Sequence, residues 1–414
     1  MEPIVSTAVE EQDGSPPALR MMTEVLDRSH LAVPDQIAAI IGAGAAEVAM
    51  TASTYLVDYP QRRLVPLSPT TSASPRRAQN VDSTVAGRSF RLVEVLPGRS
   101  SGGREHLWVP IVDGVERLGV LHVGLPVGTA IDDGPTRDHI RWLAHLAGHI
   151  IASKSPYGDE FHRVRTAQDR TVASELVWSL LPPLTVAADG VVISGLLEPA
   201  HSVAGDVFDY AISHDLADVA VVDATGHDVQ SGIIGALTLA AYRNSRRRQL
   251  SLQAAMDLVD ETLMDFGSHS YATGVFGQLE LSSGVFHYMN AGHPAPLLLR
   301  AGKVVRSLDA GRRTLLGFSG PPKTHAAEQL EPGDWIVLYT DGIPEARDEE
   351  RNFFGMDRFI DVIERCAADR LPAPETLRHI MQSILRHQHG KLQDDATLLI
   401  VQWAGGGELR LNAC

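Results

Sequence analysis

The chain has 414 residues and a formal net charge of −15, with 44% hydrophobic and 21% charged residues. This composition excludes a disordered, collagen-like or coiled-coil protein, and at about 100–200 residues per domain the chain has room for two to four domains. No apolar run reaches the roughly 20 residues of a transmembrane helix, and the first residues lack a basic segment followed by an apolar stretch. We therefore expect a cytoplasmic protein without a membrane partner, and its acidity argues against nucleic acid as a partner.

The first third of the chain predicts a small α+β module after a disordered or short helical lead at residues 1–34. Apolar segments at 54–57 and 63–65 predict a pair of strands. Asp113-Gly114 predicts a tight turn between strands at 107–112 and 117–123. Helical spacing returns at 136–153. Strands flanked by helices over this length indicate a sensor-sized domain at residues 35–155.

The same region resembles a GAF domain. The resemblance rests on Tyr55-Leu56-Val57-Asp58-Tyr59, on Ser83 to Phe90 and on Leu107 to Gly124. It implies that the domain binds a small ligand or mediates dimers, and it leaves the ligand unknown.

A linker is expected at residues 156–184. Residues 159–181 predict one long helix, and Pro182-Pro183 ends it because proline cannot continue a helix. Two interpretations stay open. The helix packs on its own domain, or it forms a homodimer and carries a signal forward.

From residue 190 onward, the pattern predicts an α+β sandwich followed by a tail at 404–414. Helical stretches interrupt a long series of strands, and late helices precede the final strand. The expected strands are 191–197, 207–211, 219–222, 274–280, 285–289, 296–299, 335–339 and 398–402. The expected helices are 231–242, 252–265, 355–368 and 374–388.

Aspartates recur at the ends of these apolar strands. Asp206 lies near a strand start, Asp223 and Asp341 each end an apolar run, and Asp394-Asp395 precede the last strand. If the strands are neighbours, the carboxylates meet at one edge of the sandwich, where like charges are costly without cations. Oxygen-only ligands suit Mg²⁺ or Mn²⁺, and two such ions about 3.5–4 Å apart can bind a phosphate ester and activate water.

An ordered set of motifs strengthens this interpretation. In chain order they are Pro199 to Asp209, Asp223-Ala224-Thr225-Gly226-His227, Asn290-Ala291-Gly292-His293-Pro294, Tyr339-Thr340-Asp341-Gly342, Glu345-Ala346-Arg347 and Asp394-Asp395-Ala396-Thr397. Over residues 185–403 they resemble the bacterial SpoIIE/RsbU branch of the metal-dependent PPM (2C-type) serine/threonine protein phosphatases. The resemblance implies a β-sandwich flanked by helices in the order α-β-β-α.

The resemblance also implies residue roles and two metal ions. Asp223 would bridge both ions, the carbonyl of Ala224 would bind the second, and Asp341 and Asp394 would complete the ligands. Asp206 would ligate or orient water, and a hydroxide on the metals would be the nucleophile. Asp395 is either a ligand or a supporting residue, and the sequence does not separate Asp394 from Asp395. His227 contacts phosphate, protonates the leaving oxygen or shapes the loop.

The implied function is hydrolysis of phosphoserine or phosphothreonine on a regulatory partner. The family analogy points to a phosphorylated STAS-domain anti-sigma factor antagonist, with the GAF-like domain as regulator. One alternative is a catalytically silent binding module that uses the phosphatase fold to recognise a partner. A second alternative is a hydrolase of small phosphate esters that uses the same site.

Overall fold

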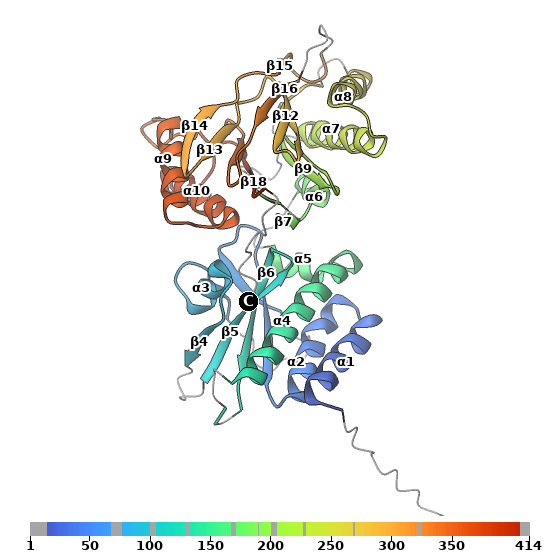
Figure 1. Ribbon diagram of the computed structural model, residues 1–414, viewed down its shortest axis with the longest axis vertical. Helices are drawn as coiled ribbons and strands as arrows, with labels where there is room; N and C mark the ends of the chain where they lie inside the picture. The colour runs from blue at the N-terminus through green and yellow to red at the C-terminus, as the bar shows by residue number, and fades with distance from the viewer. Residues whose placement is uncertain are drawn as a thin grey trace, which may run out of the picture. The chain divides into compact units, whose positions relative to one another are not determined.

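The computed structural model describes residues 15–67, 77–99, 105–126, 128–129, 133–166, 171–188, 190–199, 205–226, 229–267, 270–318, 320 and 325–405. These residues form two compact units, an N-terminal unit up to residue 166 and a C-terminal unit from residue 171 (Figure 1). The division falls inside the linker that the sequence predicts.

The N-terminal unit is built on one six-stranded sheet with the strand order β3-β2-β1-β6-β5-β4. The strands are β1 (Thr51–Val57), β2 (Arg63–Pro66), β3 (Gln79–Asn80), β4 (Leu96–Arg99), β5 (Glu105–Asp113) and β6 (Glu116–Gly124). The two predicted strand pairs are present, and Gly114 takes the positive φ of 58° that the tight turn between β5 and β6 requires.

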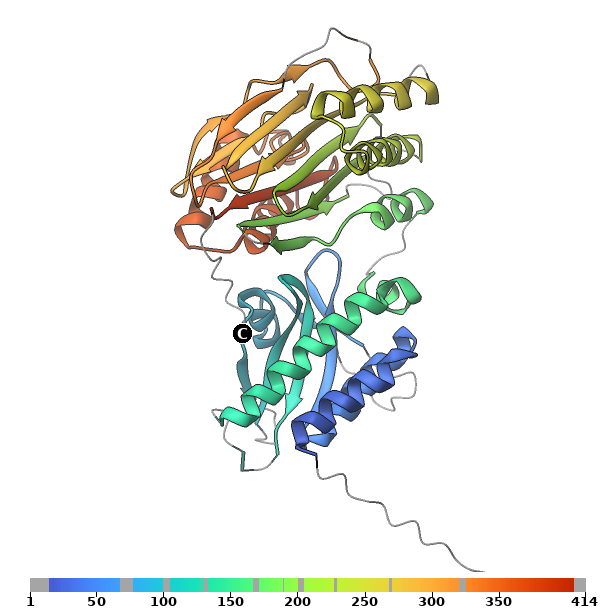
Figure 2. The same cartoon turned by 45° about the vertical axis from the view of Figure 1, so that its right-hand side comes forward.

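Helices cover both faces of this sheet. They are α1 (Pro17–His30), α2 (Ile37–Glu47), α3 (Val85–Leu92) and α4 (Gly134–Lys154), with a single 3-10 turn before α2 (Pro34–Gln36) and another after α4 (Ser155–Tyr157). Leu56 packs in one core with α1, α2 and α4, whereas its neighbours Tyr55 and Val57 pack in a second core with Phe90 of α3. Figure 2 shows α1 (blue) and α4 (green) across one face of the sheet. The predicted α+β module is therefore present, while its GAF resemblance stays a prediction.

Helix α1 lies inside the segment for which the sequence predicts a disordered or short helical lead. It begins at Pro17, and its Met21 and Val25 are fully buried in the core. Residues 1–14 lie outside the described part. Burial against α2 and α4 stabilises this helix, which a proline begins.

The long helix predicted over 159–181 is instead two short helices, α5 (Glu160–Arg165) and α6 (Val172–Leu180). Thr166 leaves the helical region with a ψ of 116°, and its hydroxyl donates to the carbonyl of His162. Thr171 then caps α6, because its hydroxyl accepts from the N–H of Ser174. Threonine side chains that bond to nearby backbone groups favour helix ends, so this segment contains two helices.

The C-terminal unit contains two six-stranded sheets. One has the order β15-β12-β11-β10-β9, with β16 also paired to β12, and the other has the order β14-β13-β17-β18-β8-β7. The strands are β7 (Thr185–Ala188), β8 (Val191–Glu198), β9 (Asp206–Ile212), β10 (Leu216–Ala224), β11 (Ala272–Glu280), β12 (Val285–Ala291), β13 (Leu297–Arg300), β14 (Lys303–Ser307), β15 (Arg312–Arg313), β16 (Ala326–Gln329), β17 (Trp335–Tyr339) and β18 (Ala396–Trp403).

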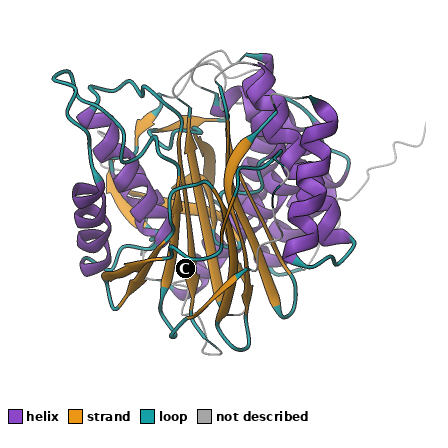
Figure 3. Ribbon diagram, turned by 90° about the horizontal axis from the view of Figure 1, so that it is seen from above, coloured by secondary structure: helices purple, strands orange, loops and turns teal. Residues whose placement is uncertain are grey.

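Four longer helices enclose the two sheets of this unit. They are α7 (Val229–Arg247), α8 (Leu252–Phe266), α9 (Met356–Ala368) and α10 (Ala373–His387). Helices α7 and α8 pack on β9, β10 and β11, and α9 and α10 pack on β8, β14 and β18. The predicted α-β-β-α sandwich is therefore confirmed, and Figure 3 shows its strands (orange) between helices (purple).

The last strand shows why a continuous apolar run belongs at the centre of this sandwich. Leu399 and Val401 pack in the core between the sheets, whereas Leu398 and Ile400 pack in the core beneath α9 and α10. Side chains alternate along a strand, so a strand covered on both faces is apolar at every position. All eight strands and all four helices predicted for this unit are present, with small shifts at their ends.

Throughout the described residues, each helix is either too short or too polar to cross a membrane.

Candidate metal centre

The aspartates predicted at strand ends meet at one edge of the sandwich. Asp223 of β10 lies directly opposite Asp206 of β9 in the antiparallel register. Asp341 follows β17, and Asp394 and Asp395 precede β18, which pairs with β17. Strand pairing therefore sets two neighbouring carboxylates in one sheet and three in the other.

Hydrogen bonds join the two sheets at this edge. The Thr340 hydroxyl donates to Asp206 Oδ2 at 2.8 Å, and the Gly205 N–H donates to Asp395 Oδ2 at 2.7 Å. The Thr340 hydroxyl also accepts from the N–H of Thr397 at 3.0 Å, which fixes its orientation. Sequence reasoning assigned no role to Thr340, although a hydroxyl residue directly before Asp341 at the end of an apolar strand was a usable signal.

Burial and repulsion between carboxylates raise the pKa values of three aspartates at this edge. Burial raises the pKa of Asp206 well above its usual value, and Asp223 and Asp395 raise it further. Burial raises the pKa of Asp223 to about 7, with added repulsion from Asp341, Asp394 and Asp395. Burial, followed by repulsion from Asp394, also raises the pKa of Asp341. These shifts are the mark of carboxylates gathered without a positive charge between them.

The donor set fits a hard divalent cation. Among the described residues, neither Lys nor Arg forms an ion pair with Asp206, Asp223, Asp341 or Asp394. The described carboxylates of this edge offer oxygen ligands, which matches the preference of Mg²⁺ and Mn²⁺. Within the same described part, the side chains do not form a ready-made cluster of three or more His, Cys, Asp or Glu at ligand distances. The carboxylates are thus neighbours that a cation would draw together.

Two glycines allow the close approach of backbone at this edge. A Cβ on Gly342 would lie 2.0 Å from the carbonyl oxygen of Asp395, and a Cβ on Gly205 would lie 2.6 Å from the carbonyl oxygen of Ala224. Any larger residue would push these segments apart. Gly205 therefore positions the one backbone carbonyl that the sequence analysis places among the ligands.

The remaining motif residues have other positions. His227 lies outside the described residues. His293 is 2% exposed, and its Nδ1 lies 2.8 Å from the Thr273 hydroxyl. Asp209 is paired with Arg243 and Arg246 of α7, so it supports the fold beside the carboxylate edge.

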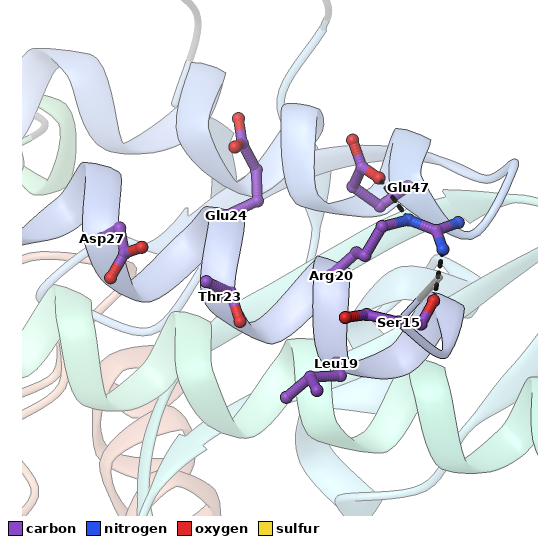
Figure 4. Close-up of a pocket in the computed structure, with 7 residues that line it drawn as sticks. All are labelled: Ser15, Leu19, Arg20, Thr23, Glu24, Asp27 and Glu47. Carbon is purple, nitrogen blue, oxygen red and sulfur yellow. Dashed lines mark hydrogen bonds and ion pairs between the residues drawn. The ribbon is translucent and has the colours of Figure 1, made fainter. Parts of the chain in front are cut away.

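A surface pocket lies elsewhere, in the N-terminal unit. Figure 4 shows its lining from α1, from Ser15 two residues before α1, and from Glu47 at the end of α2. Arg20 crosses it, pairing with Glu47 at 3.2 Å and donating to the carbonyl of Ser15 at 2.5 Å. Its lining is mostly polar and internally paired, so it does not compete with the carboxylate edge as the functional site.

Comparison with known proteins gives a family likeness for the C-terminal unit. Residues 214–404 match the family model described as Stage II sporulation protein E (SpoIIE). Over these residues, just under half of the chain, the C-terminal unit is similar to SpoIIE-family phosphatase domains.

Three known proteins are similar to this chain over part of their length. Phosphoserine phosphatase RsbU of Bacillus subtilis is 23% identical over 238 residues, which are 56% of this chain and 69% of RsbU. Protein IcfG of Synechocystis is 24% identical over 72% of this chain and 51% of IcfG. The solved RsbU and RsbW domains of Rv1364c from Mycobacterium tuberculosis share 27% identity over 53% of this chain and 63% of theirs, with a TM-score of 0.48. The chain thus spans about half the length of IcfG.

Proposed function

We propose that the C-terminal unit is a divalent-metal-dependent phosphatase that removes phosphate from phosphoserine or phosphothreonine on a partner protein. The observation that carries this proposal is the meeting of Asp206, Asp223, Asp341 and Asp394 at one edge without a cationic partner in the described residues. The SpoIIE match and the naming of RsbU and RsbP as phosphoserine phosphatases support the same reaction.

We assign the metal ligands from this geometry. Asp223, the carbonyl of Ala224, Asp341 and Asp394 would hold the ions, with Asp206 as a ligand or as an acceptor for the attacking water. When bound, two Mg²⁺ or Mn²⁺ ions supply an activated water and positive charge for the phosphate. Asp395 already accepts the Gly205 N–H, so we assign it a positioning role in which it fixes the segment before β9.

Thr340 has a separate positioning role. Its hydroxyl donates to Oδ2 of Asp206 and so orients that carboxylate. Loss of this hydroxyl would free the carboxylate to rotate.

We further propose that the substrate is a phosphorylated STAS-domain antagonist of an anti-sigma factor, and that the GAF-like N-terminal unit regulates the reaction. The RsbU likeness supports the substrate class. A path for regulation is supported by Arg243, which donates to the carbonyl of Leu180 at the end of α6 and also binds Asp209, three residues from Asp206. A small ligand in the N-terminal unit and a homodimer through the 159–181 segment stay predictions.

The direct test is phosphate release from a phosphoserine-bearing STAS-domain protein, with Mn²⁺ or Mg²⁺ and with a chelator. We expect metal-dependent release by the wild type, and a loss of about 100- to 1,000-fold in Asp223→Asn, as for removal of one preorganised charge at a reaction centre. Asp215→Asn is the matched control, because Asp215 is an exposed aspartate at the opposite end of β10.

Three outcomes separate the candidate functions. Release that Asp223→Asn abolishes supports the phosphatase. Partner binding without release, unchanged in Asp223→Asn, would favour the binding module instead. Hydrolysis of a small ester without release from any phosphoprotein would favour the small-ester hydrolase.

A further inference from the structure

A short hairpin lies beside the carboxylate edge and has no part in the roles assigned above. It spans residues 344–355 and begins three residues after Asp341. Arg347 and Phe353 form its antiparallel bridge. The Phe354 N–H donates to the carbonyl of Ala346 at 2.7 Å, and Asp348 and Asn352 close the tip through backbone and side-chain hydrogen bonds.

Two side chains of the hairpin are buried in the core of the C-terminal unit. Ala346 and Phe354 are buried in the core beneath α9 and α10, together with Ile343. Because side chains alternate along extended backbone, their neighbours Arg347 and Phe353 lie on the outer side. Phe353 is 51% exposed, and the guanidinium of Arg347 lies 4.5 Å from the centre of its ring. The exposed ring of Phe353 stacks on the guanidinium of Arg347 and so orients it.

Some arginines of this unit bind carboxylates, whereas Arg347 and Arg358 each stack on a phenylalanine. Arg300, Arg313 and Arg378 each pair with a carboxylate. In the described part of the chain, Arg347 has the stacking contact with Phe353 and no carboxylate partner. Of the carboxylates on the same hairpin, Asp348 binds Asn352, Glu349 lies 4.0 Å from His389, and Glu345 lies near enough to Asp341 to raise its pKa.

A residue next to the carboxylate edge forms a hydrogen bond with the backbone of Arg347. The side-chain amide of Gln393 donates to the carbonyl of Arg347 at 3.0 Å. Gln393 directly precedes Asp394, so a single side chain links the hairpin to a proposed metal ligand. The positive charge of Arg347 thus lies on a segment that one hydrogen bond links to the residue before Asp394.

We propose that Arg347, held by Phe353, binds an oxyanion of the phosphoprotein substrate and so determines substrate affinity. This inference rests on the proposed phosphatase function and extends it to a residue outside the metal ligands. The ligand would present a pair of oxygen atoms, from a phosphate or a carboxylate. The planar guanidinium can bind such a pair with two parallel hydrogen bonds. The oxyanion is either the phosphoserine phosphate or an acidic side chain next to it.

The experiment measures kcat and KM of the full chain with Mn²⁺ on two synthetic peptides. One carries phosphoserine flanked by Asp, and the other carries phosphoserine flanked by Ala. We expect Arg347→Ala to raise KM about tenfold or more while kcat changes little, because a charged hydrogen bond is lost on binding. A rise on both peptides identifies the phosphate as the ligand, and a rise on the Asp-flanked peptide alone identifies the flanking carboxylate.

Control variants separate this role from a structural one. Arg351→Asn removes the same charge from the same hairpin at a residue whose φ of 66° asparagine tolerates. It is expected to leave KM unchanged. Phe353→Leu removes the stacked ring and should raise KM less than Arg347→Ala, while Arg347→Lys should restore part of the affinity. The melting temperatures of these variants should match the wild type.

An unchanged KM in Arg347→Ala, or equal rises in Arg347→Ala and Arg351→Asn, would overturn the inference. If the wild type releases no phosphate from either peptide, the proposed function fails, and fluorescence anisotropy of the same labelled peptides then decides the inference alone. Weaker binding by Arg347→Ala than by Arg351→Asn would support it, and equal or absent binding by both would overturn it.

Discussion

Two buried aspartates on β9, three residues apart, have opposite surroundings. Asp209 is 1% exposed and binds two arginines of α7, with Arg243 at 2.7 Å. Asp206 is 3% exposed, and its neighbours are Asp223 and Asp395, which repel it, and the hydroxyl of Thr340. The comparison teaches that a buried carboxylate whose counter-charge is part of the chain supports the fold. We propose that one without it, such as Asp206, binds a cation from solution.

The largest change in stability is expected when Asp209 is substituted. We expect Asp209→Asn to destabilise the protein by about 3 kcal/mol, because it leaves the guanidinium groups of Arg243 and Arg246 without their buried partner. Urea unfolding of the metal-free protein measures this change. The exposed Asp215→Asn serves as the control and should stay within about 0.5 kcal/mol of the wild type. A loss that small in Asp209→Asn would mean that the arginine pairs do not stabilise the fold.

Asp206→Asn should not lower the stability of the metal-free protein, in contrast to Asp209→Asn. Removing this charge relieves repulsion from Asp223 and Asp395, so the metal-free protein should be as stable as the wild type or more stable. The same variant should lose stabilisation by Mn²⁺. Destabilisation of the metal-free protein comparable to that of Asp209→Asn would show that the two aspartates have the same role.

A smaller effect is expected from the backbone at the carboxylate edge. Gly205→Ala would place a methyl group 2.6 Å from the carbonyl oxygen of Ala224, so that carbonyl must move. We expect Mn²⁺ affinity to fall about tenfold, in the range seen when residues that support metal ligands are changed. Gly134→Ala is the control, since no atom lies within 4 Å of its Cβ position. Equal affinities in calorimetry would show that the Ala224 carbonyl does not bind metal.

A pH-dependent effect is expected at His293, a buried and neutral residue of the C-terminal unit. Burial lowers its pKa to about 4. The unfolded chain takes up the proton at about pH 6.5, so this residue's contribution is complete above pH 6.5 and is lost as the pH falls towards 4. Between pH 7 and pH 5, the wild type should lose about 1–2 kcal/mol more than His293→Gln in urea unfolding. Parallel losses would place the proton uptake at other groups.

The sequence predicts the fold of the C-terminal unit well because its strands are apolar on both faces and end in turns with Gly and Asp. Leu398 to Val401 is an example, since burial on two sides leaves an unmistakable run. The edge strands β7, β14, β15 and β16 were not predicted, because their half-exposed residues carry no such signal.

The candidate site is predictable to a similar degree. Strand-end position and the ordered motifs indicate Asp206, Asp223, Asp341 and Asp394. What separates Asp206 from Asp209 is a pair of arginines more than 30 positions further along the chain, and α7 brings them back onto β9. The break at Thr166 and the bridge between Arg347 and Phe353 likewise depend on tertiary contacts that local patterns do not contain.

Titration of the metal-free full chain with Mn²⁺ in a calorimeter tests the central claim most directly. The account predicts binding to the wild type and to Asp215→Asn, and weak or absent binding to Asp206→Asn and Asp223→Asn. Binding that is undiminished in both of these edge variants would contradict it, because the cations would then lie elsewhere in the protein.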